Sequence, residues 1–270
     1  MTSLVAIIFF ILGLIIGSFL NVVILRLNTR KSFFGAFSGR SACMSCQNKL
    51  SWYELIPLFS FLGLKGRCRN CKTKISIQYP LVEFGTGLIF AGIFWKLSFL
   101  IEQDLLIFTI SYIYYAFMFS LLVVIAIYDL KHKIIPDLLS FIFGAFAFVG
   151  LFLFSNFIFF IHFPTILEFL SGILTAFPFA FFWFISGGKW MGFGDAKLAL
   201  GIGWLLGLIG ALSGLVVAFW SGAIVGIILV ILSKKHKINS MGMKSEIPFA
   251  PFLVLGAFLA FIFELNFFGF

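Results

Sequence analysis

Two acidic motifs hold the residues best suited to chemistry. Asp129 begins the stretch 129–137, and Asp195 ends the stretch 192–195. Each lies where a long apolar run meets a polar loop. Two carboxyl groups held close together cannot both ionise, so they share a proton. One can then activate a water molecule while the other protonates or holds the carbonyl oxygen of a peptide bond. The pattern therefore predicts a catalytic pair of aspartates.

Each of these acids also has a purely structural interpretation. Asp195 and Asp137 suit the N-terminus of a helix, where an anion is favourable. Asp129 is expected near a helix C-terminus, where the helix dipole disfavours a negative charge. That position requires compensation, which Lys131 or Lys133 can supply in part. On the residues alone, the catalytic and the structural interpretations both stay open.

Glycines, prolines and a third acid surround these motifs. Gly192 and Gly194 allow backbone conformations closed to other residues, and they permit close approach of an extended substrate. Glu246 precedes the last apolar run and lies near Pro248 and Pro251, which break helices. A helix entry at the membrane edge is the simpler interpretation of this last segment.

All four cysteines lie in one polar block, residues 26–79, as two Cys-x2-Cys pairs. Cys43 pairs with Cys46 and Cys68 with Cys71, with 21 residues between the pairs. This pattern is typical of a tetrahedral four-thiolate zinc site, which leaves no open position for catalysis. Nearby cations favour thiolates, and a cytoplasmic location disfavours disulfides. We therefore expect a structural Zn²⁺ that folds a loop with little core of its own.

The composition decides which class of protein carries these motifs. The chain has 270 residues, of which 62% are hydrophobic and only 11% are charged. Soluble domains have about a quarter charged residues, so a soluble globular protein and a disordered one are both excluded. A net charge of +9 would indicate a nucleic-acid partner only if the protein were soluble. In a membrane protein, cations gather in the cytoplasmic loops, so no nucleic-acid partner is expected.

Apolar runs long enough to cross a bilayer recur along the chain. The first, residues 4–25, is about 22 residues long, which suffices for a hydrocarbon core of roughly 30 Å. The others cover residues 80–101, 105–128, 138–161, 165–187, 197–211, 213–233 and 249–267. We expect an all-α polytopic membrane protein with about eight transmembrane helices and a cytoplasmic zinc-binding loop. Its expected divisions are a first helix at 1–25, the loop at 26–79 and a helical bundle at 80–270.

The cations predict the orientation of these spans. With the N-terminus outside, the inside loops are 26–79, 129–137, 188–197 and 234–248. They hold 10, 2, 2 and 4 Lys and Arg residues, which is 18 of the 19 in the chain. Only Lys96 lies elsewhere. This bias predicts that both aspartates and the cysteine block face the cytoplasm.

Several segments, taken in order, resemble the prepilin peptidases. These are the type IV leader peptidase/N-methyltransferases of the GxGD class of membrane aspartic proteases. The resemblance rests on residues 17–26, the two cysteine pairs, and residues 64–71, 75–83, 129–137, 192–197 and 246–252. Met44, Asn28 and Ala250 depart from residues common in the family, and none of them is one of the proposed catalytic acids.

The resemblance implies an activity, its cofactors and its partners. It implies Asp129 and Asp195 as the catalytic pair in the bacterial inner membrane, with prepilin and pseudopilin substrates cleaved on the cytoplasmic side after a glycine. It also implies methylation of the new N-terminal residue by S-adenosyl-L-methionine. The supporting site residues are Lys131, Asp137, Gly192, Gly194, Lys197 and Glu246. The sequence contains no Gly-rich nucleotide-binding fingerprint that would locate the methyl-donor site. We place Asn21, Arg26 and Glu83 near that site.

Three other functions stay open at this point. The first is a peptidase whose cysteine block only docks substrate and that transfers no methyl group. The second is a zinc-stabilised membrane transporter whose acids line a proton path. The third is a structural component of a pilus or secretion machine that has lost its activity.

Overall fold

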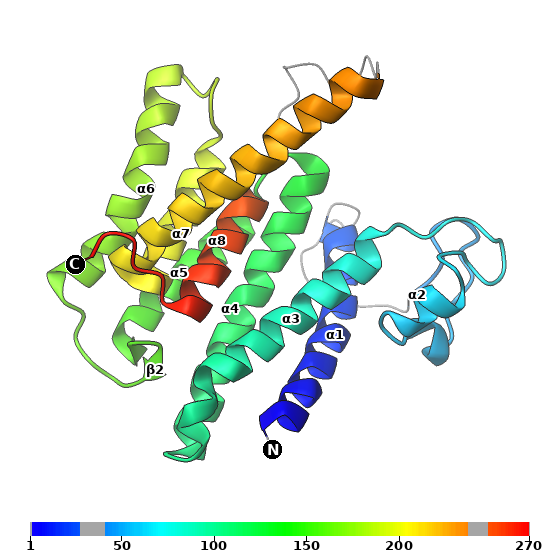
Figure 1. The fold of residues 1–270 in the computed structure, drawn as a ribbon, viewed down its shortest axis with the longest axis horizontal. Helices are drawn as coiled ribbons and strands as arrows, with labels where there is room; N and C mark the ends of the chain where they lie inside the picture. The colour runs from blue at the N-terminus through cyan, green and yellow to red at the C-terminus, as the bar shows by residue number, and fades with distance from the viewer. Residues whose placement is uncertain (1, 28–40, 237–247, 270) are drawn as a thin grey trace. The chain divides into compact units, whose positions relative to one another are not determined.

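The computed structural model describes residues 2–27, 41–236 and 248–269, which are mostly helical (Figure 1). The long helices are α1 (Thr2–Leu27), α3 (Gln78–Leu97), α4 (Leu105–His132), α5 (Asp137–Leu153), α6 (Ile166–Ser186), α7 (Phe193–His236) and α8 (Ala250–Phe263). Two compact units are present. One comprises residues 1–105 with 115–120, and the other comprises residues 106–114 with 121–270.

Length and apolar composition make this a membrane protein, as the sequence predicts. Within the described residues, five helices are long and apolar enough to cross a bilayer: Ser3–Leu27, Gln78–Ile101, Leu105–His132, Ile166–Ser186 and Phe193–Leu232. Helices α5 and α8 are apolar but shorter. Large apolar side chains stay exposed on these helices, among them Ile8, Phe141 and Phe181. Such side chains suit contact with lipid rather than with water.

Three of the predicted spans have other boundaries in the structure. The runs 197–211 and 213–233 both lie in α7, which consists of two helical segments that meet at Gly207 (φ 72°, ψ 171°), so the boundary lies a few residues before the predicted one. The run 138–161 ends as a helix at Leu153, and a hairpin of β1 (Phe154–Ser155) and β2 (Ile158–Phe159) follows. The two residues that join these strands, Asn156 and Phe157, both have positive φ, as a type I′ turn requires. Apolar Phe and Ile suit both a span and a hairpin, so hydropathy does not separate the two.

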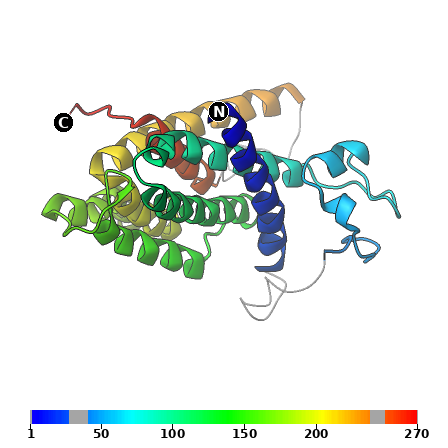
Figure 2. The same cartoon turned by 90° about the horizontal axis from the view of Figure 1, so that it is seen from below.

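In the first unit, α1 and α3 lie side by side, and the cysteine loop lies beyond the N-terminal end of α3 (Figures 1 and 2). A Cβ on Gly17 would lie 2.8 Å from the Cα of Glu83, so only glycine permits this approach. Nearby, the Asn21 amide donates to the carbonyl oxygen of Tyr79 at 3.2 Å. The loop contains two short helical pieces, η2 (Trp52–Leu55) and α2 (Phe59–Gly63), and η3 (Ser98–Ile101) follows α3.

In the second unit, α7 packs against α5, α6 and α8 (Figure 1). Small residues let the backbones meet: a Cβ on Gly203 would lie 2.6 Å from the Cα of Gly172, on α6. Gly256 of α8 approaches Gly214 of α7 even more closely. These contacts hold the N-terminal half of α7 against α6, and its C-terminal half against α8. The start of α7, which carries Asp195, is thereby held in place.

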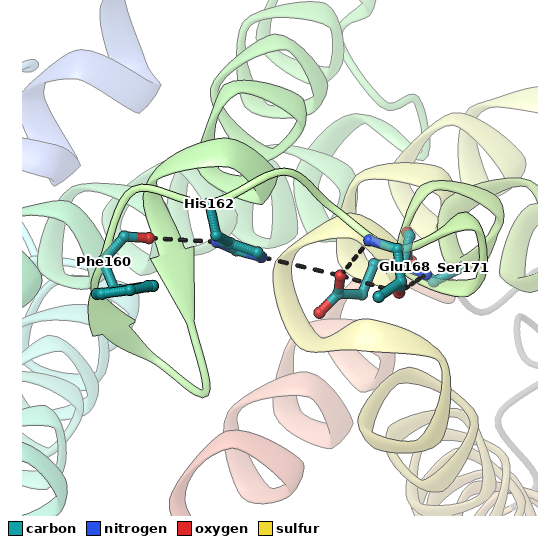
Figure 3. A network of polar contacts seen from close by, with 5 residues as sticks. Phe160, His162, Glu168 and Ser171 are labelled. Atoms are coloured by element: carbon teal, nitrogen blue, oxygen red, sulfur yellow. Dashed lines mark hydrogen bonds and ion pairs between the residues drawn. The ribbon is translucent and has the colours of Figure 1, made fainter.

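The loop that enters α6 is held by polar side chains (Figure 3). Glu168 accepts from the Thr165 backbone N–H at 2.7 Å, and Thr165 Oγ1 accepts from the Glu168 backbone N–H. This reciprocal pair caps the helix. The His162 ring lies 3.8 Å from the same carboxylate, and Ser171 bonds to the carbonyl oxygen of Gly203 in α7. The cap therefore determines where α6 begins and ties it to α7.

Candidate active site and metal centre

Asp129 lies in the last turn of α4 with only 5% of its surface exposed. Its Oδ2 accepts a hydrogen bond at 3.3 Å from the backbone N–H of Ala250, the first residue of α8. The positive end of the α8 dipole therefore faces this carboxylate. The compensation that its position requires comes from a second helix. Lys131 and Lys133, which the sequence offered for this purpose, are both exposed.

Asp195 lies in the first turn of α7 with 9% of its surface exposed. Its backbone N–H donates to the carbonyl oxygen of Gly192 at 3.3 Å. The charge of Asp129 acts on the Asp195 carboxyl group, so the two acids belong to one electrostatic environment. Both carboxyl groups thus lie at helix N-termini, one within its own helix and one against a neighbouring helix.

The two glycines of the Asp195 motif have different surroundings. A Cβ on Gly194 would lie 2.9 Å from Ile135 Cβ, so Gly194 is required for the packing of α7 against that residue. A Cβ on Gly192 would meet nothing closer than 3.9 Å, and one of its nearest atoms would be Asp195 Oδ2 at 4.0 Å. Gly192 therefore leaves space beside the carboxylate.

The supporting polar residues are only partly brought together. Lys197 Nζ lies 2.6 Å from Asp137 Oδ1, which joins the first turn of α7 to the first residue of α5. Lys197 also lies over the Phe193 ring, 5.3 Å from its centroid. Pro136 is the N-cap residue of α5, so Asp137 is its first helical residue. Lys131 is exposed at the end of α4, and Glu246 lies outside the described residues.

The four cysteine sulfur atoms converge. All four Sγ atoms lie within 4.8 Å of one another, and none forms a disulfide. The separation of Cys43 Sγ from Cys71 Sγ is 3.8 Å. A tetrahedron with Zn–S bonds of about 2.3 Å has S···S edges of about 3.8 Å, so this donor set fits Zn²⁺.

The two cysteine pairs have the same backbone arrangement. Cys43 N–H donates to Asn48 and Cys68 N–H donates to Thr73, in each case to the carbonyl oxygen five residues on. The residue after each pair, Gln47 or Lys72, has positive φ. Two matching turns therefore present their thiols to a common centre.

Hydrogen bonds lower the pKa of two of these thiols. The Thr73 side chain, and then its backbone N–H, lower the pKa of the Cys71 thiol to about 6. The Cys46 backbone N–H lowers the pKa of Cys43. Since the thiolate is the form that binds metal, these contacts favour the metal-bound state.

The residues placed near the methyl donor gather in part where α1 meets α3. Asn21 is buried, and its Oδ1 has no hydrogen-bond partner among the residues that the structure describes. Glu83 is also buried, and its Oε2 accepts from the backbone N–H of Leu58 at 2.9 Å. Arg26 lies in the last turn of α1 and is half-buried.

Sequence reasoning missed two backbone hydrogen-bond partners. The N–H group of Ala250 donates to Asp129, and the N–H group of Leu58 donates to Glu83. A backbone donor has no residue type, so composition gives no sign of it. The one available signal was the pair of prolines around Ala250. Pro251 lies in the first turn of α8, where a proline is tolerated, and this marks a helix N-terminus that faces an acid.

Two known protein families match successive parts of the chain. Residues 11–97 match the bacterial peptidase A24 N-terminal domain, and residues 116–231 match the type IV leader peptidase family. No solved structure matches.

Several curated relatives have the name prepilin leader peptidase/N-methyltransferase. The chain is 42% identical to the Myxococcus xanthus protein over 49% of its own length and 36% of that protein's length. It is 37% identical to the Vibrio cholerae protein, over 53% and 55% of the two lengths. The chain thus spans about a third and about half of these two relatives. The match to the Pectobacterium carotovorum protein, at 32% identity, covers 78% of this chain and 82% of that one.

Proposed function

The chain belongs to the type IV leader peptidase family, and we propose that it cleaves the leader peptides of prepilin-like proteins with Asp129 and Asp195. One observation carries the proposal. The two acids are buried, come from α4 and α7, interact electrostatically, and each faces a helix N-terminus. A pair of this kind performs general acid–base chemistry on a peptide bond.

The cleavage step divides between the two carboxyl groups. The ionised one takes a proton from water, and the oxygen of that water attacks the scissile carbonyl carbon. The protonated one donates to the carbonyl oxygen, whose charge develops in the transition state. When the C–N bond breaks, the leaving amine takes the proton that came from water and becomes the new N-terminus, while the former carbonyl oxygen returns its proton to the other carboxylate. The space beside Gly192 is where an extended substrate strand would lie next to Asp195.

The substrates are prepilins and pseudopilins, which combine a short basic leader with an apolar helix. That helix would lie in the membrane while the leader enters the cytoplasmic region. Asp137 and Glu246 are the acids proposed to attract leader cations. Asp137 is largely exposed although it is paired with Lys197, so its charge is accessible to a substrate.

The second proposed activity is N-methylation of the new N-terminal residue. S-adenosyl-L-methionine, when bound, supplies the methyl group. The Glu83 carboxylate and Asn21 Oδ1, which has no partner within the described part of the chain, fit a ligand that brings hydrogen-bond donors. Asn21, Arg26 and Glu83 remain our candidates for this site. We also propose that the chain divides into a first helix at 1–25, the cysteine loop at 26–79 and a helical bundle at 80–270.

The cysteine cluster would hold a structural Zn²⁺. Cys43, Cys46, Cys68 and Cys71 supply four thiolates, and no position then remains for a substrate. Its contribution is the folding of the loop, and it takes no part in either reaction.

The proposed location is the bacterial inner membrane, with the N-terminus outside. The loops on the inner side then hold 18 of the 19 Lys and Arg residues, as the positive-inside rule requires. Both aspartates and the cysteine cluster would then face the cytoplasm, where prepilin leaders lie.

The test is mass spectrometry of a prepilin incubated with purified protein and S-adenosyl-L-methionine. We expect cleavage by the wild type, with a gain of one methylene mass on the new N-terminus. Asp129→Asn and Asp195→Asn should each lose roughly 10²- to 10⁴-fold in cleavage rate. Cleavage without the mass gain would refute methylation alone, and no cleavage by folded wild type would refute the peptidase.

A further inference from the structure

A short segment of the cysteine loop exposes an unusual number of large apolar side chains. We define the interfacial segment as residues 52–62, which include η2 and α2. Trp52 is 77% exposed, and Phe59 and Leu62 are each 71% exposed. Tyr53, Leu55 and Ile56 are exposed as well. The segment lies outside the membrane-spanning helices, so the lipid contact that explains exposed side chains on those helices does not automatically apply to it.

A hydrogen bond determines the depth of this segment. The backbone N–H of Leu58, near its middle, donates to Glu83 Oε2 at 2.9 Å. Glu83 is the sixth residue of α3, which begins the candidate span Gln78–Ile101. Five steps along a helix correspond to about 7.5 Å. Leu58 is therefore held level with the second turn of a membrane helix, which is the depth of the membrane–water interface.

The charge of the loop identifies what covers the segment. Between residues 41 and 77 there are six cations and one acid, Glu54, so the side chains other than cysteine sum to +5. The cations are all exposed: Lys49, Lys65, Arg67, Arg69, Lys72 and Lys74. Four zinc-bound thiolates would lower this sum to +3 and keep its sign. A positive surface attracts anionic lipid headgroups and repels a basic leader peptide.

The segment also has a place for a headgroup. A hollow in its surface is lined in part by Tyr53, Phe59 and Arg69, and also by Glu54, whose carboxylate accepts from the backbone N–H of Ser51 at 2.8 Å. The Arg69 guanidinium donates to the Tyr53 hydroxyl and lies 5.3 Å from the centroid of its ring. Tyrosine and tryptophan concentrate where apolar chains meet headgroups, and arginine reaches phosphate from the same level.

We propose that residues 52–62 bind the anionic surface of the membrane that the chain spans. Trp52, Phe59 and Leu62 enter the boundary between headgroups and acyl chains, while the surrounding cations contact lipid phosphates. The loop would then lie against the bilayer instead of extending into the cytoplasm.

The fluorescence of Trp52 tests this with the full chain in bilayers. Subtracting the emission of Trp52→Phe from that of the wild type isolates one indole and leaves the segment apolar. The bilayers are phosphatidylcholine, with or without phosphatidylglycerol, and carry bromine either near the headgroup or near the chain ends. We expect Trp52 emission to be lost with bromine near the headgroup, more strongly when phosphatidylglycerol is present, and to resist aqueous acrylamide.

The double variant Phe59→Ser, Leu62→Ser should reduce this quenching and restore acrylamide access. Met44→Ser changes an exposed apolar residue elsewhere in the loop, and quenching should persist in it. The proposal would be overturned if aqueous acrylamide quenched Trp52 emission and lipid-borne bromine did not. So would protection of Trp52 only on addition of a prepilin, since the segment would then bind substrate. The measurement requires neither cleavage nor methylation, so it is independent of the proposed enzyme activity.

Discussion

The Oδ2 atom of Asp129 lies 3.3 Å from the backbone nitrogen of Ala250, the first residue of α8. These residues are 121 positions apart in the chain. Asp129 is buried at the C-terminus of α4, where the helix dipole disfavours a negative charge. The contact places its carboxylate against the N-terminus of α8, where the dipole favours one. The start of α8 is therefore part of the site, although it contributes no functional side chain.

This contact separates two roles of Asp129. In Asp129→Asn an oxygen still accepts from Ala250, so cleavage should fall while the unfolding temperature stays near that of the wild type. Asp129→Ala also leaves a buried N–H unpaired, which costs about 1–3 kcal/mol. Peptide mass spectrometry and thermal unfolding in detergent would measure the two effects. Equal stability of the two variants would contradict the importance of this hydrogen bond.

The two glycines before Asp195 should respond differently to alanine. Gly194→Ala forces a methyl group against Ile135, and overpacking of this kind costs about 1–3 kcal/mol. Gly192→Ala meets no close atom, so its stability should change by less than about 0.5 kcal/mol. The added methyl group would nevertheless occupy space beside the Asp195 carboxylate and reduce kcat/KM. Each variant serves as the control for the other. Full cleavage by Gly192→Ala would show that the substrate does not use that space.

The pair formed by Lys197 and Asp137 should contribute little to stability. Asp137 is largely exposed, and an exposed ion pair is worth about 0–1 kcal/mol. Lys197→Gln releases the Asp137 carboxylate, so the KM for a basic leader should fall. The KM for a leader with neutralised cations should stay unchanged. Lys197→Gln combined with Asp137→Asn should abolish the difference, and a KM that ignores leader charge would exclude Asp137 from substrate attraction.

Removal of metal should affect the cysteine loop before the helical bundle. A chelator would remove the metal ion, and Cys68→Ser would remove one of its thiolate ligands. Either change should expose residues 41–77 to protease, because the loop has few buried residues of its own. Limited proteolysis with mass mapping would locate the cuts, and added Zn²⁺ should reverse the effect of the chelator. Identical digestion patterns with and without chelator would argue against a structural metal.

Much of the framework was predictable because it depends on composition. Apolar runs predict membrane helices regardless of their partners, and this prediction is confirmed for the fold class. The spacing of Cys43, Cys46, Cys68 and Cys71 predicts their convergence, because each pair needs only a local turn. The sulfur atoms do converge. The identity of a bound metal and the catalytic roles of the aspartates remain predictions.

Other features depend on contacts that no local pattern encodes. The break at Gly207 lies within a continuous apolar stretch, where glycine is also common as a packing residue. The partner of Glu83 is the backbone N–H of Leu58. Leu58 has a positive φ, and a leucine in the sequence does not indicate such a backbone conformation. Asn21 and Tyr79 meet only because α1 and α3 approach through glycines. Such relationships follow from tertiary packing.

The break at Gly207 has a consequence for the membrane itself. It leaves a first half of α7, residues 193–206, of about 14 residues, or roughly 21 Å. The neighbours of α7 include α8, with 14 residues, and α5, with 17, so they measure roughly 21 and 26 Å. A hydrocarbon core of about 30 Å exceeds all three lengths. Local thinning of the bilayer is one response to such a hydrophobic mismatch, and it would bring water and headgroups toward the two aspartates.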